Sequence, residues 1–323
     1  MNARQTMHVR AVDLFCGAGG SSWGAQAAGA QIVAGVDMWG LAGSVFKDNF
    51  PHARFHESRL EDLKPKSLAR ELGAIDLLLA SPECTNHSAA KGNRPRCEES
   101  RETAFQVIRF AEALGPRWIV VENVVSMRLW ARYREFLGAL AVLGYHATEH
   151  VLNAADFGVP QNRRRLFIVL DRERKPDAIQ PPKSRARTAL DVVDQNGRYT
   201  YSPLDTPSRA RATLDRANRA VAALGDGASF LVVYYGSDGA GGWQPLHVPL
   251  RTITTLDRFA YVKPTREGHV MRMLQPPELQ RAMGMPQRFK IAHGSRRDRI
   301  HLIGNAVCPP VMQHIVQALI RKG

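Results

Sequence analysis

The chain has 323 residues, of which 44% are hydrophobic and 23% are charged, a composition typical of a globular protein with room for one large and one smaller domain. Lysine and arginine total 44 against 30 acidic residues. The resulting net charge of +14 favours a polyanionic partner, nucleic acid first, over charge that serves only solubility. No segment approaches the length needed to span a bilayer, and the N-terminus has no long apolar core, so we expect neither membrane insertion nor secretion.

The four cysteines are scattered along the chain and show no C-x-x-C spacing; they are Cys16, Cys84, Cys97 and Cys308. This spacing suggests neither a zinc site nor a disulfide framework. We therefore predict no metal site and a reducing, intracellular setting.

Residues 8–15 have the apolar pattern of a buried strand, and a glycine-rich turn at residues 16–22 follows directly. Glycines between a strand and a helix let the backbone approach a ligand closely, and the helix that follows offers free amide groups. The pattern therefore predicts a ligand-binding turn, with a merely tight turn as the alternative.

A second strand at residues 31–36 ends at Asp37. A nucleotide-binding sheet places a carboxylate at this distance to hold two ribose hydroxyls. Asp37 is also a candidate N-cap for a helical stretch at residues 39–49, and the two roles can coexist. A short polar passage containing Glu57 follows, with no element assigned to it.

An apolar run of strand length at residues 75–80 stops at Ser81-Pro82, and Cys84 follows. A parallel sheet presents its chemistry at the carboxyl ends of its strands, so Cys84 is the candidate nucleophile, with an inert packing thiol as the alternative. The polar and basic loop at residues 81–100 is long for an α/β connection, which is typical of a lid or binding loop.

The strand predicted at residues 117–121 delivers Glu122 and Asn123 to the same edge of the sheet. A carboxylate beside a thiol at that edge indicates acid chemistry paired with nucleophilic attack, and an N-cap role for Asn123 is the alternative. Further helical stretches are predicted at residues 64–72, 103–114 and 130–143, and further strands at residues 145–152 and 166–170.

The apolar periodicity fades between residues 171 and 206, which predicts a linker. Beyond it we predict a helix at residues 208–224, a strand at residues 230–235 and a helix that begins at Pro276. Trp243 follows a glycine-rich turn, where it either contacts bases or anchors the loop as a buried aromatic side chain.

Six blocks occur in order along the chain: Asp13-Leu14-Phe15-Cys16-Gly17-Ala18-Gly19-Gly20, Pro82-Glu83-Cys84 with Ser88, Glu122-Asn123-Val124, Gln161-x-Arg163-x-Arg165, Arg251-Thr252-Ile253-Thr254-Thr255 and Gly304-Asn305-Ala306-Val307. Each block is weak alone. Their order and spacing closely resemble those of the DNA cytosine-5 methyltransferases.

This resemblance implies an α/β fold: a doubly wound, mostly parallel Rossmann-like methyltransferase sheet with a second, smaller target-recognition domain. It implies a catalytic, S-adenosylmethionine-binding domain at residues 1–175, the small domain at residues 176–285, and a C-terminal segment at residues 286–323 that returns to the catalytic domain.

The resemblance also implies S-adenosylmethionine as the cofactor. The residues expected to bind it are Phe15, Cys16, Gly17, Ala18, Gly19, Gly20, Asp37, Met38, Glu57, Pro82, Asn305 and Ala306. Asp37 would hold the ribose, Met38 would lie on one face of the adenine, and Glu57 would hold the adenine amino group.

The implied reaction begins when the Cys84 thiolate adds to carbon 6 of a flipped-out cytosine, which makes carbon 5 nucleophilic. Glu122 would bond ring nitrogen 3 and donate a proton, and positive charge from Arg163 or Arg165 would help to ionise or hold the thiolate. No metal is needed. The residues expected to contact DNA are Ser88, Lys91, Arg94, Arg96, Thr252 and Thr254.

The implied partners are double-stranded DNA and a cognate restriction endonuclease or other defence-system protein, with no membrane. A monomer is sufficient, because one chain carries one cofactor pocket and one nucleophile. The expected location is cytoplasmic and nucleoid-associated, in a bacterial cell or encoded by a phage. Methylation of transfer RNA by the same motifs is an alternative, and a catalytically silent DNA-binding relative is another.

The chain departs from the family pattern beside the nucleophile, where Glu83 and Thr85 replace the usual proline and glutamine. Glu83 adds a negative charge that opposes thiolate formation, and Thr85 removes a side chain that reaches into the DNA. The region between the arginine-bearing blocks, residues 171–248, is short for target recognition. We therefore expect a short or relaxed recognition sequence.

Overall fold

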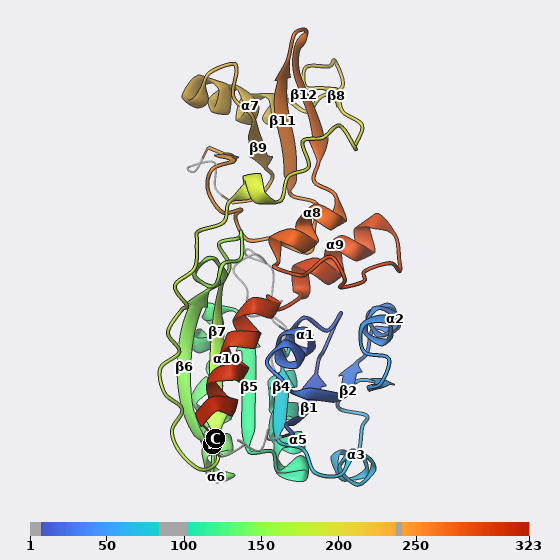
Figure 1. The fold of residues 1–323 in the computed structure, drawn as a ribbon, viewed down its shortest axis with the longest axis vertical. Helices are drawn as coiled ribbons and strands as arrows, with labels where there is room; N and C mark the ends of the chain where they lie inside the picture. Colours follow the sequence, from blue (N-terminus) through green and yellow to red (C-terminus); the bar gives the residue numbers. More distant parts are fainter. Residues whose placement is uncertain (1–7, 84–101, 237–240, 323) are drawn as a thin grey trace, which may run out of the picture.

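The computed structural model describes residues 8–83, 102–236 and 241–322, and its larger part is built on a seven-stranded sheet (Figure 1). The strand order is β3-β2-β1-β4-β5-β7-β6. The strands are β1 (Arg10–Leu14), β2 (Gln31–Asp37), β3 (Arg54–Glu57), β4 (Leu77–Ala80), β5 (Trp118–Asn123), β6 (His146–Asn153) and β7 (Arg164–Asp171). Neighbours from β3 to β5 are parallel, and β7 runs antiparallel to both β5 and β6. The predicted mostly parallel α/β sheet is confirmed.

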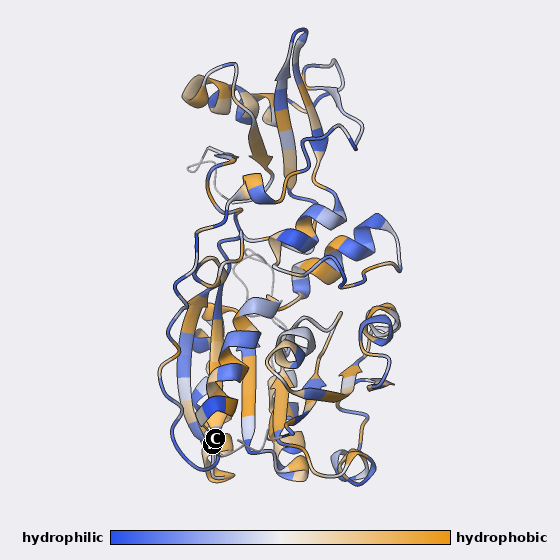
Figure 2. Ribbon diagram, viewed as in Figure 1, coloured by the Kyte–Doolittle hydropathy of each residue, from blue (hydrophilic) through white to orange (hydrophobic). Residues whose placement is uncertain are grey.

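Helices cover both faces of this sheet. One face packs against α1 (Gly20–Ala27), α2 (Gly40–Asn49) and α10 (Pro309–Lys322), and the other against α3 (Pro65–Leu72), α5 (Gln106–Leu114) and α6 (Tyr133–Val142). Successive residues of β4 therefore enter different cores, with Leu77 and Leu79 in one and Leu78 and Ala80 in the other. Two buried faces explain the continuous apolar run of this strand. Figure 2 shows its hydrophobic colouring along β4 and most of β5.

The polar passage that contains Glu57 forms the edge strand β3, which the sequence pattern did not indicate. Its four residues, Arg54–Glu57, are exposed or half-buried, so they carry no apolar run. β3 pairs with β2 through backbone hydrogen bonds, and that pairing places Glu57 opposite Asp37.

Helix α10 returns to the first helix of the chain (Figure 1, red beside blue). A Cβ atom at Gly24 would lie 2.5 Å from the Pro309 carbonyl oxygen, so the glycine permits the close approach of α1 and α10. Residues at the end of the chain thereby pack beside residues that follow the first strand.

A second sheet of five antiparallel strands has the order β10-β9-β11-β12-β8. Its strands are β8 (Ser202–Pro203), β9 (Phe230–Val233), β10 (Trp243–Pro245), β11 (Phe259–Thr265) and β12 (Gly268–Met273). Helix α7 (Arg211–Leu224) packs on one face, around Ala217, Ala220 and Phe230, and Trp243 packs against the same cluster. Trp243 is half-buried against this cluster, which suits the anchoring role, and its contact with bases stays a prediction. The domain boundaries at residues 175 and 285 stay predictions.

Short 3-10 helices and two further α-helices complete the described elements. They are η2 (Thr103–Phe105), η3 (Val125–Leu129), η4 (Ala154–Phe157), η5 (Ala189–Asp191), α8 (Pro276–Ala282) and α9 (Arg296–Asn305). Helix α8 begins at Pro276 as predicted. No helix in the described part of the chain is long and apolar enough to cross a membrane.

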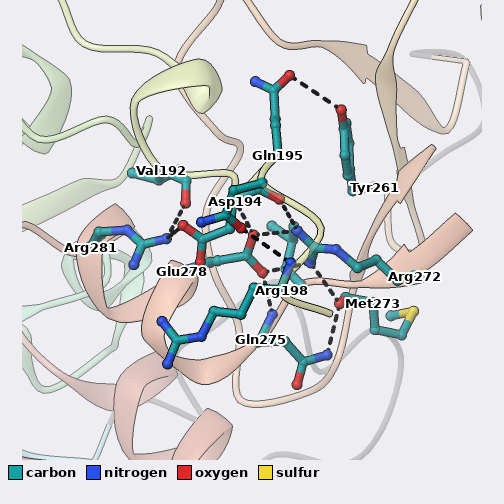
Figure 3. A network of polar contacts seen from close by, with 12 residues as sticks. Val192, Asp194, Gln195, Arg198, Tyr261, Arg272, Met273, Gln275, Glu278 and Arg281 are labelled. Carbon is teal, nitrogen blue, oxygen red and sulfur yellow. Dashed lines mark hydrogen bonds and ion pairs between the residues drawn. The ribbon is translucent and has the colours of Figure 1, made fainter. Parts of the chain in front are cut away.

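A buried ion pair joins the small sheet to α8 (Figure 3). The Arg272 guanidinium on β12 donates to both carboxylate oxygens of Glu278, at 2.8 and 2.7 Å. The same carboxylate accepts the backbone N–H groups of Asp194 and Gln275, each at 2.7 Å. Glu278 is 0% exposed and Arg272 is 5% exposed. Two charges this deeply buried are tolerated because each is paired and hydrogen-bonded.

We predict that Glu278→Gln lowers the free energy of unfolding by about 3 kcal/mol, because it leaves the Arg272 cation buried without its counter-charge. Urea denaturation followed by circular dichroism would measure the change. Glu173→Gln is the matched control, because the Glu173 side chain is 63% exposed in its pair with Arg117, and it should cost less than about 1 kcal/mol. Equal losses for the two variants would contradict the buried-pair account.

Candidate active site

The glycine-rich turn after β1 is strained at Phe15, whose φ is +57°; within the described residues no other non-glycine residue has a positive φ. The turn is closed by the Gly19 N–H, which donates to the Cys16 carbonyl oxygen at 2.8 Å. Gly19 has φ +89°, and a Cβ there would lie 2.4 Å from the Phe50 ring. A Cβ at Gly17 would meet no atom within 4 Å, so space lies open beside the turn. Strain held by surrounding structure is typical of a binding site.

Asp37, at the end of β2, connects this turn to the next one. Its Oδ2 accepts the Gly17 N–H at 2.8 Å and its Oδ1 accepts the Trp39 N–H at 2.9 Å. The N-cap residue of α2 is Trp39, so the N-cap role considered for Asp37 is wrong. Burial raises the pKa of the Asp37 carboxyl, and the hydrogen bonds from backbone N–H groups oppose part of that rise.

Met38 and Glu57 lie beside Asp37 at the same edge of the sheet. The Met38 side chain is 69% exposed, which is unusual for a large apolar group and is expected where a flat ligand covers it. The Glu57 carboxylate lies against Gly40, where a Cβ would approach its Oε1 to 2.6 Å. The ends of three neighbouring strands thus gather the Phe15 turn, Asp37, Met38 and Glu57.

The C-terminal part of the chain meets this turn at Ala306. A Cβ at Gly20 would lie 2.4 Å from the Val307 carbonyl oxygen and 3.4 Å from the Ala306 Cβ. Asn305, the last residue of α9, is exposed beside them. The structure therefore brings Asn305 and Ala306 next to the predicted cofactor turn, although almost 300 residues separate them in sequence.

Asp13 carries a buried carboxyl beneath the turn. The sequence alone indicated no role for this residue. Its Oδ2 accepts the Ser22 hydroxyl at 2.6 Å and the Ser22 N–H at 3.2 Å. Asp13 is 0% exposed, and burial raises its pKa to about 7, with the nearby Asp37 charge adding to the rise. The Asp residue inside an otherwise apolar strand was the signal that could have identified it.

Glu122 and Arg165 form an ion pair at the end of β5. The Arg165 Nε lies 3.3 Å from Glu122 Oε1, and the Glu122 side chain is 9% exposed. Burial raises the pKa of the Glu122 carboxyl, and the positive charges of Arg165 and Arg163 oppose part of that rise. A carboxyl held in this balance can donate a proton to a bound group.

Arg163 is 4% exposed and bonds three backbone carbonyl groups from two distant segments. Its Nη1 donates to the Ile253 oxygen at 2.9 Å, and its Nη2 donates to the Gly304 oxygen at 2.9 Å and the Ala306 oxygen at 3.1 Å. A Cβ at Gly304 would lie 2.3 Å from the Thr254 oxygen, so a glycine is required where these segments meet. The role of Arg163 toward the thiolate stays a prediction.

Gln161 is a second residue that connects distant segments, and it is fully buried. It lies in the same sequence block as Arg163 and Arg165, but the sequence alone indicated no role for it. Its Oε1 accepts the Ile253 N–H at 2.8 Å, and its Nε2 donates to the Ala282 oxygen at 3.1 Å. The Thr252 hydroxyl donates to the Asn162 oxygen at 2.7 Å. Thr252 and Thr254 therefore lie on a strip of chain held against the start of β7.

The end of β4 is tied to the end of β5, because Asn123 Nδ2 donates to the Pro82 oxygen at 3.1 Å. Asn123 Oδ1 also accepts the Val124 N–H at 2.8 Å. Pro82 is thereby held beside Asn123, the residue that follows Glu122 in the chain. The predicted residues Cys84, Ser88, Lys91, Arg94 and Arg96 lie outside the described residues.

In the ranges that the structure describes, no three His, Cys, Asp or Glu side chains lie close enough together to hold a metal ion. Cys16 and Cys308 are buried free thiols there. Burial raises the pKa of both, and for Cys308 to about 11, so neither is a thiolate near neutral pH.

In a comparison with known proteins, residues 9–321 match the family model of the C-5 cytosine-specific DNA methylases. The chain is 27% identical to the type II methyltransferase M.HgiDI of Herpetosiphon aurantiacus, over 93% of this chain and 90% of that protein. It is 24% identical to M.FnuDI of Fusobacterium nucleatum, over 97% and 94%. The fold superposes on the S. pombe Dnmt2 methyltransferase with a TM-score of 0.71, at 15% identity over 98% of this chain and 99% of that one.

The contribution of Asp13 to the free energy of unfolding should decrease as the pH rises. The unfolded chain releases this proton near pH 3.8, whereas the folded chain holds it to about pH 7. The contribution is therefore fully present below pH 3.8 and is lost as the pH rises toward 7.

Asp13→Asn removes this titration. We predict that the unfolding free energy of the wild type minus that of the variant falls by roughly 2 to 3 kcal/mol between pH 5 and pH 8. Urea denaturation of both proteins at the two pH values would measure it. A difference that is constant, or that grows with pH, would contradict the assignment.

Proposed function

Because the chain belongs to the C-5 cytosine-specific DNA methylase family, we propose that it transfers a methyl group from S-adenosylmethionine to carbon 5 of a cytosine in DNA. The observation that most supports this proposal is the buried Glu122–Arg165 pair at the end of β5, at the same sheet edge as the turn that follows β1. The proposed catalytic residues are Cys84, Glu122, Arg163 and Arg165.

S-adenosylmethionine would supply an electrophilic methyl group on a sulfonium centre. The open space beside Gly17, the exposed face of Met38 and the acceptors at Asp37 and Glu57 suit a nucleoside held across the ends of β1, β2 and β3. Ala306 packs against the first residue of α1, Gly20, and so bounds this space from the C-terminal side.

The proposed chemistry begins with the Cys84 sulfur, which forms a bond to carbon 6 of the cytosine ring. The electron pair displaced from the ring double bond moves toward nitrogen 3, where the Glu122 carboxyl supplies a proton. Carbon 5 would then take the methyl group from the sulfonium, which leaves as a neutral thioether. A base removes the carbon 5 proton, the thiolate leaves carbon 6, and nitrogen 3 returns its proton to the Glu122 carboxylate, so the enzyme is regenerated.

Glu122 suits the proton-donating role because burial raises the pKa of its carboxyl above the ordinary value. Burial stabilises the protonated carboxyl, and the positive charge of Arg165 stabilises the carboxylate after the proton has left. Arg165 also orients the carboxyl, because its Nη1 is itself bound to the Arg164 carbonyl oxygen at 2.9 Å.

A duplex hides the cytosine face from such a site, so we propose that the target base is flipped out of the helix. The net charge of +14 suits the phosphate backbone, with Lys91, Arg94 and Arg96 as proposed contacts. Ser88, Thr252 and Thr254 are the proposed polar contacts.

The relatives named as type II methyltransferases support a role in restriction-modification, with a cognate endonuclease as the functional partner. We propose that the chain acts as a monomer in the bacterial cytoplasm on nucleoid DNA. We also propose that the recognition region corresponds to residues 176–285.

Incubation with radiolabelled S-adenosylmethionine tests the proposal. We predict label in duplex DNA, recovered as 5-methylcytosine by mass spectrometry, and none in transfer RNA. Glu122→Gln should lower the rate roughly 100-fold or more, because the carboxyl proton is lost from the reaction. Glu173→Gln, far from the site and exposed, is the control that should keep the wild-type rate.

Two outcomes would overturn the proposal. Label in transfer RNA alone would favour the RNA enzyme, and absence of label despite cofactor binding would favour a silent DNA-binding relative. A wild-type rate for Glu122→Gln would remove Glu122 from the mechanism.

A further inference from the structure

A cavity of about 300 Å³ opens where the small sheet meets the start of β7, and no step of the proposed reaction uses it. It lies between strand β10, the turn at residues 246–250 and the segment that leads into β7. The side chains and backbone that line it belong to Asn162, Trp243, Gln244, Pro245, Val248, Pro249 and Arg251.

The frame of this cavity is held by an amide side chain. Gln244 is 3% exposed; its Oε1 accepts the Arg251 N–H at 3.0 Å and its Nε2 donates to the Pro249 oxygen at 3.3 Å. The Asn162 N–H donates to the Leu250 oxygen at 2.7 Å, which closes the cavity against β7. The frame is therefore preorganised, and binding within it requires little ordering of the chain.

The described residues that line the cavity carry a net positive charge. Among the described residues that line it, Arg251 is the one cation, and no Asp or Glu is present. The Arg251 guanidinium is oriented by a hydrogen bond from its Nη2 to the Trp243 oxygen at 3.0 Å. A guanidinium presents five N–H donors in a planar fork, and this geometry matches the oxygens of a phosphate group.

The cavity adjoins the site at which we propose that cytosine is methylated. Asn162 directly precedes Arg163, and Arg251 lies two residues before Ile253, whose oxygen accepts the Arg163 Nη1. The Thr252 hydroxyl connects the two segments through the Asn162 oxygen. A nucleic acid strand that enters the site therefore passes close to Arg251.

We propose that this cavity binds one backbone phosphate of the substrate strand through Arg251, with the side-chain Nδ2 of Asn162 as a second hydrogen-bond donor. The inference rests on the proposed function and adds a defined phosphate site to it. Such a contact fixes the register of the strand in the site and carries no base identity.

The experiment uses a duplex that contains the sequence that the wild-type enzyme is found to methylate. Each phosphate near the target cytosine is replaced in turn by a neutral methylphosphonate, and affinity is measured by fluorescence anisotropy in the presence of S-adenosylhomocysteine. The wild type should lose affinity at one particular linkage. Arg251→Gln should bind the unmodified duplex roughly 10- to 100-fold more weakly and should be insensitive to substitution at that linkage.

Salt dependence provides a second readout. The slope of log affinity against log salt should decrease in magnitude by about 0.9 for Arg251→Gln, because one fewer phosphate is neutralised. Arg70→Gln is the matched control; it removes the same charge from an exposed position on α3, outside the proposed recognition region, and should leave the slope unchanged.

Asn162→Asp tests the site without removing the Arg251 hydrogen bond. Asn162 is exposed and its Oδ1 accepts from Asn153 Nδ2 at 3.0 Å, a role that an aspartate oxygen retains, so the variant should fold. The added negative charge should weaken binding, and the methylphosphonate at the Arg251 linkage should relieve that loss. Should Arg251→Gln prove unstable in thermal melting, Asn162→Asp decides the matter alone.

Equal sensitivity of the wild type and Arg251→Gln at every linkage, or an Asn162→Asp loss that no methylphosphonate relieves, would overturn the phosphate site. If the wild type methylates DNA in the same preparation, the proposed function stands while this inference fails. If the wild type methylates no duplex, the proposed function fails first.

Discussion

The architecture of the site depends on a buried guanidinium. Arg163 carries a positive charge into the interior at 4% exposure, and a buried cation is tolerated only when acceptors surround it. The acceptors are backbone carbonyl groups at Ile253, Gly304 and Ala306, which lie 90 to 143 residues further along the chain. The edge at which Glu122 lies is therefore completed only after the last third of the chain has folded back onto the sheet.

Close backbone approaches support the same closure. Gly20 faces Val307, Gly24 faces Pro309, and Gly304 faces Thr254, each at a distance that a Cβ atom would obstruct. Arg272 and Glu278 attach the small sheet to α8 in a comparable way, with a paired charge where one core adjoins another. The predicted cofactor turn and the predicted DNA-contacting strip thus share one framework, so a change in either is expected to alter the other.

The sequence permits prediction of the parts of this fold that depend on local pattern. The strands at residues 75–80 and 117–121 are identifiable because both faces are buried and the apolar run is continuous. β3 is an exposed edge strand whose partner supplies the stability, so its own residues carry no signal.

In the candidate site, too, the features that depend on local sequence could be predicted, whereas those that depend on distant parts of the chain could not. The glycine turn and Asp37 follow strands directly, whereas the contacts of Arg163 and Gln161 depend on partners about 90 or more residues away. The buried state of Asp13 likewise depends on the packing of α1. Motif spacing indicated the chemistry, and only the folded chain reveals which side chains hold the segments together.

The most direct test of the central claim, covalent catalysis on cytosine, uses a substrate from which carbon 5 cannot release its substituent. The wild type is incubated with S-adenosylmethionine and duplex DNA that contains 5-fluorocytosine, and the products are separated under denaturing conditions and weighed by mass spectrometry. We predict a protein–DNA adduct that carries one added methyl group and that is absent for Cys84→Ser. An adduct with Cys84→Ser, or none with a wild-type enzyme that methylates ordinary cytosine, would contradict it.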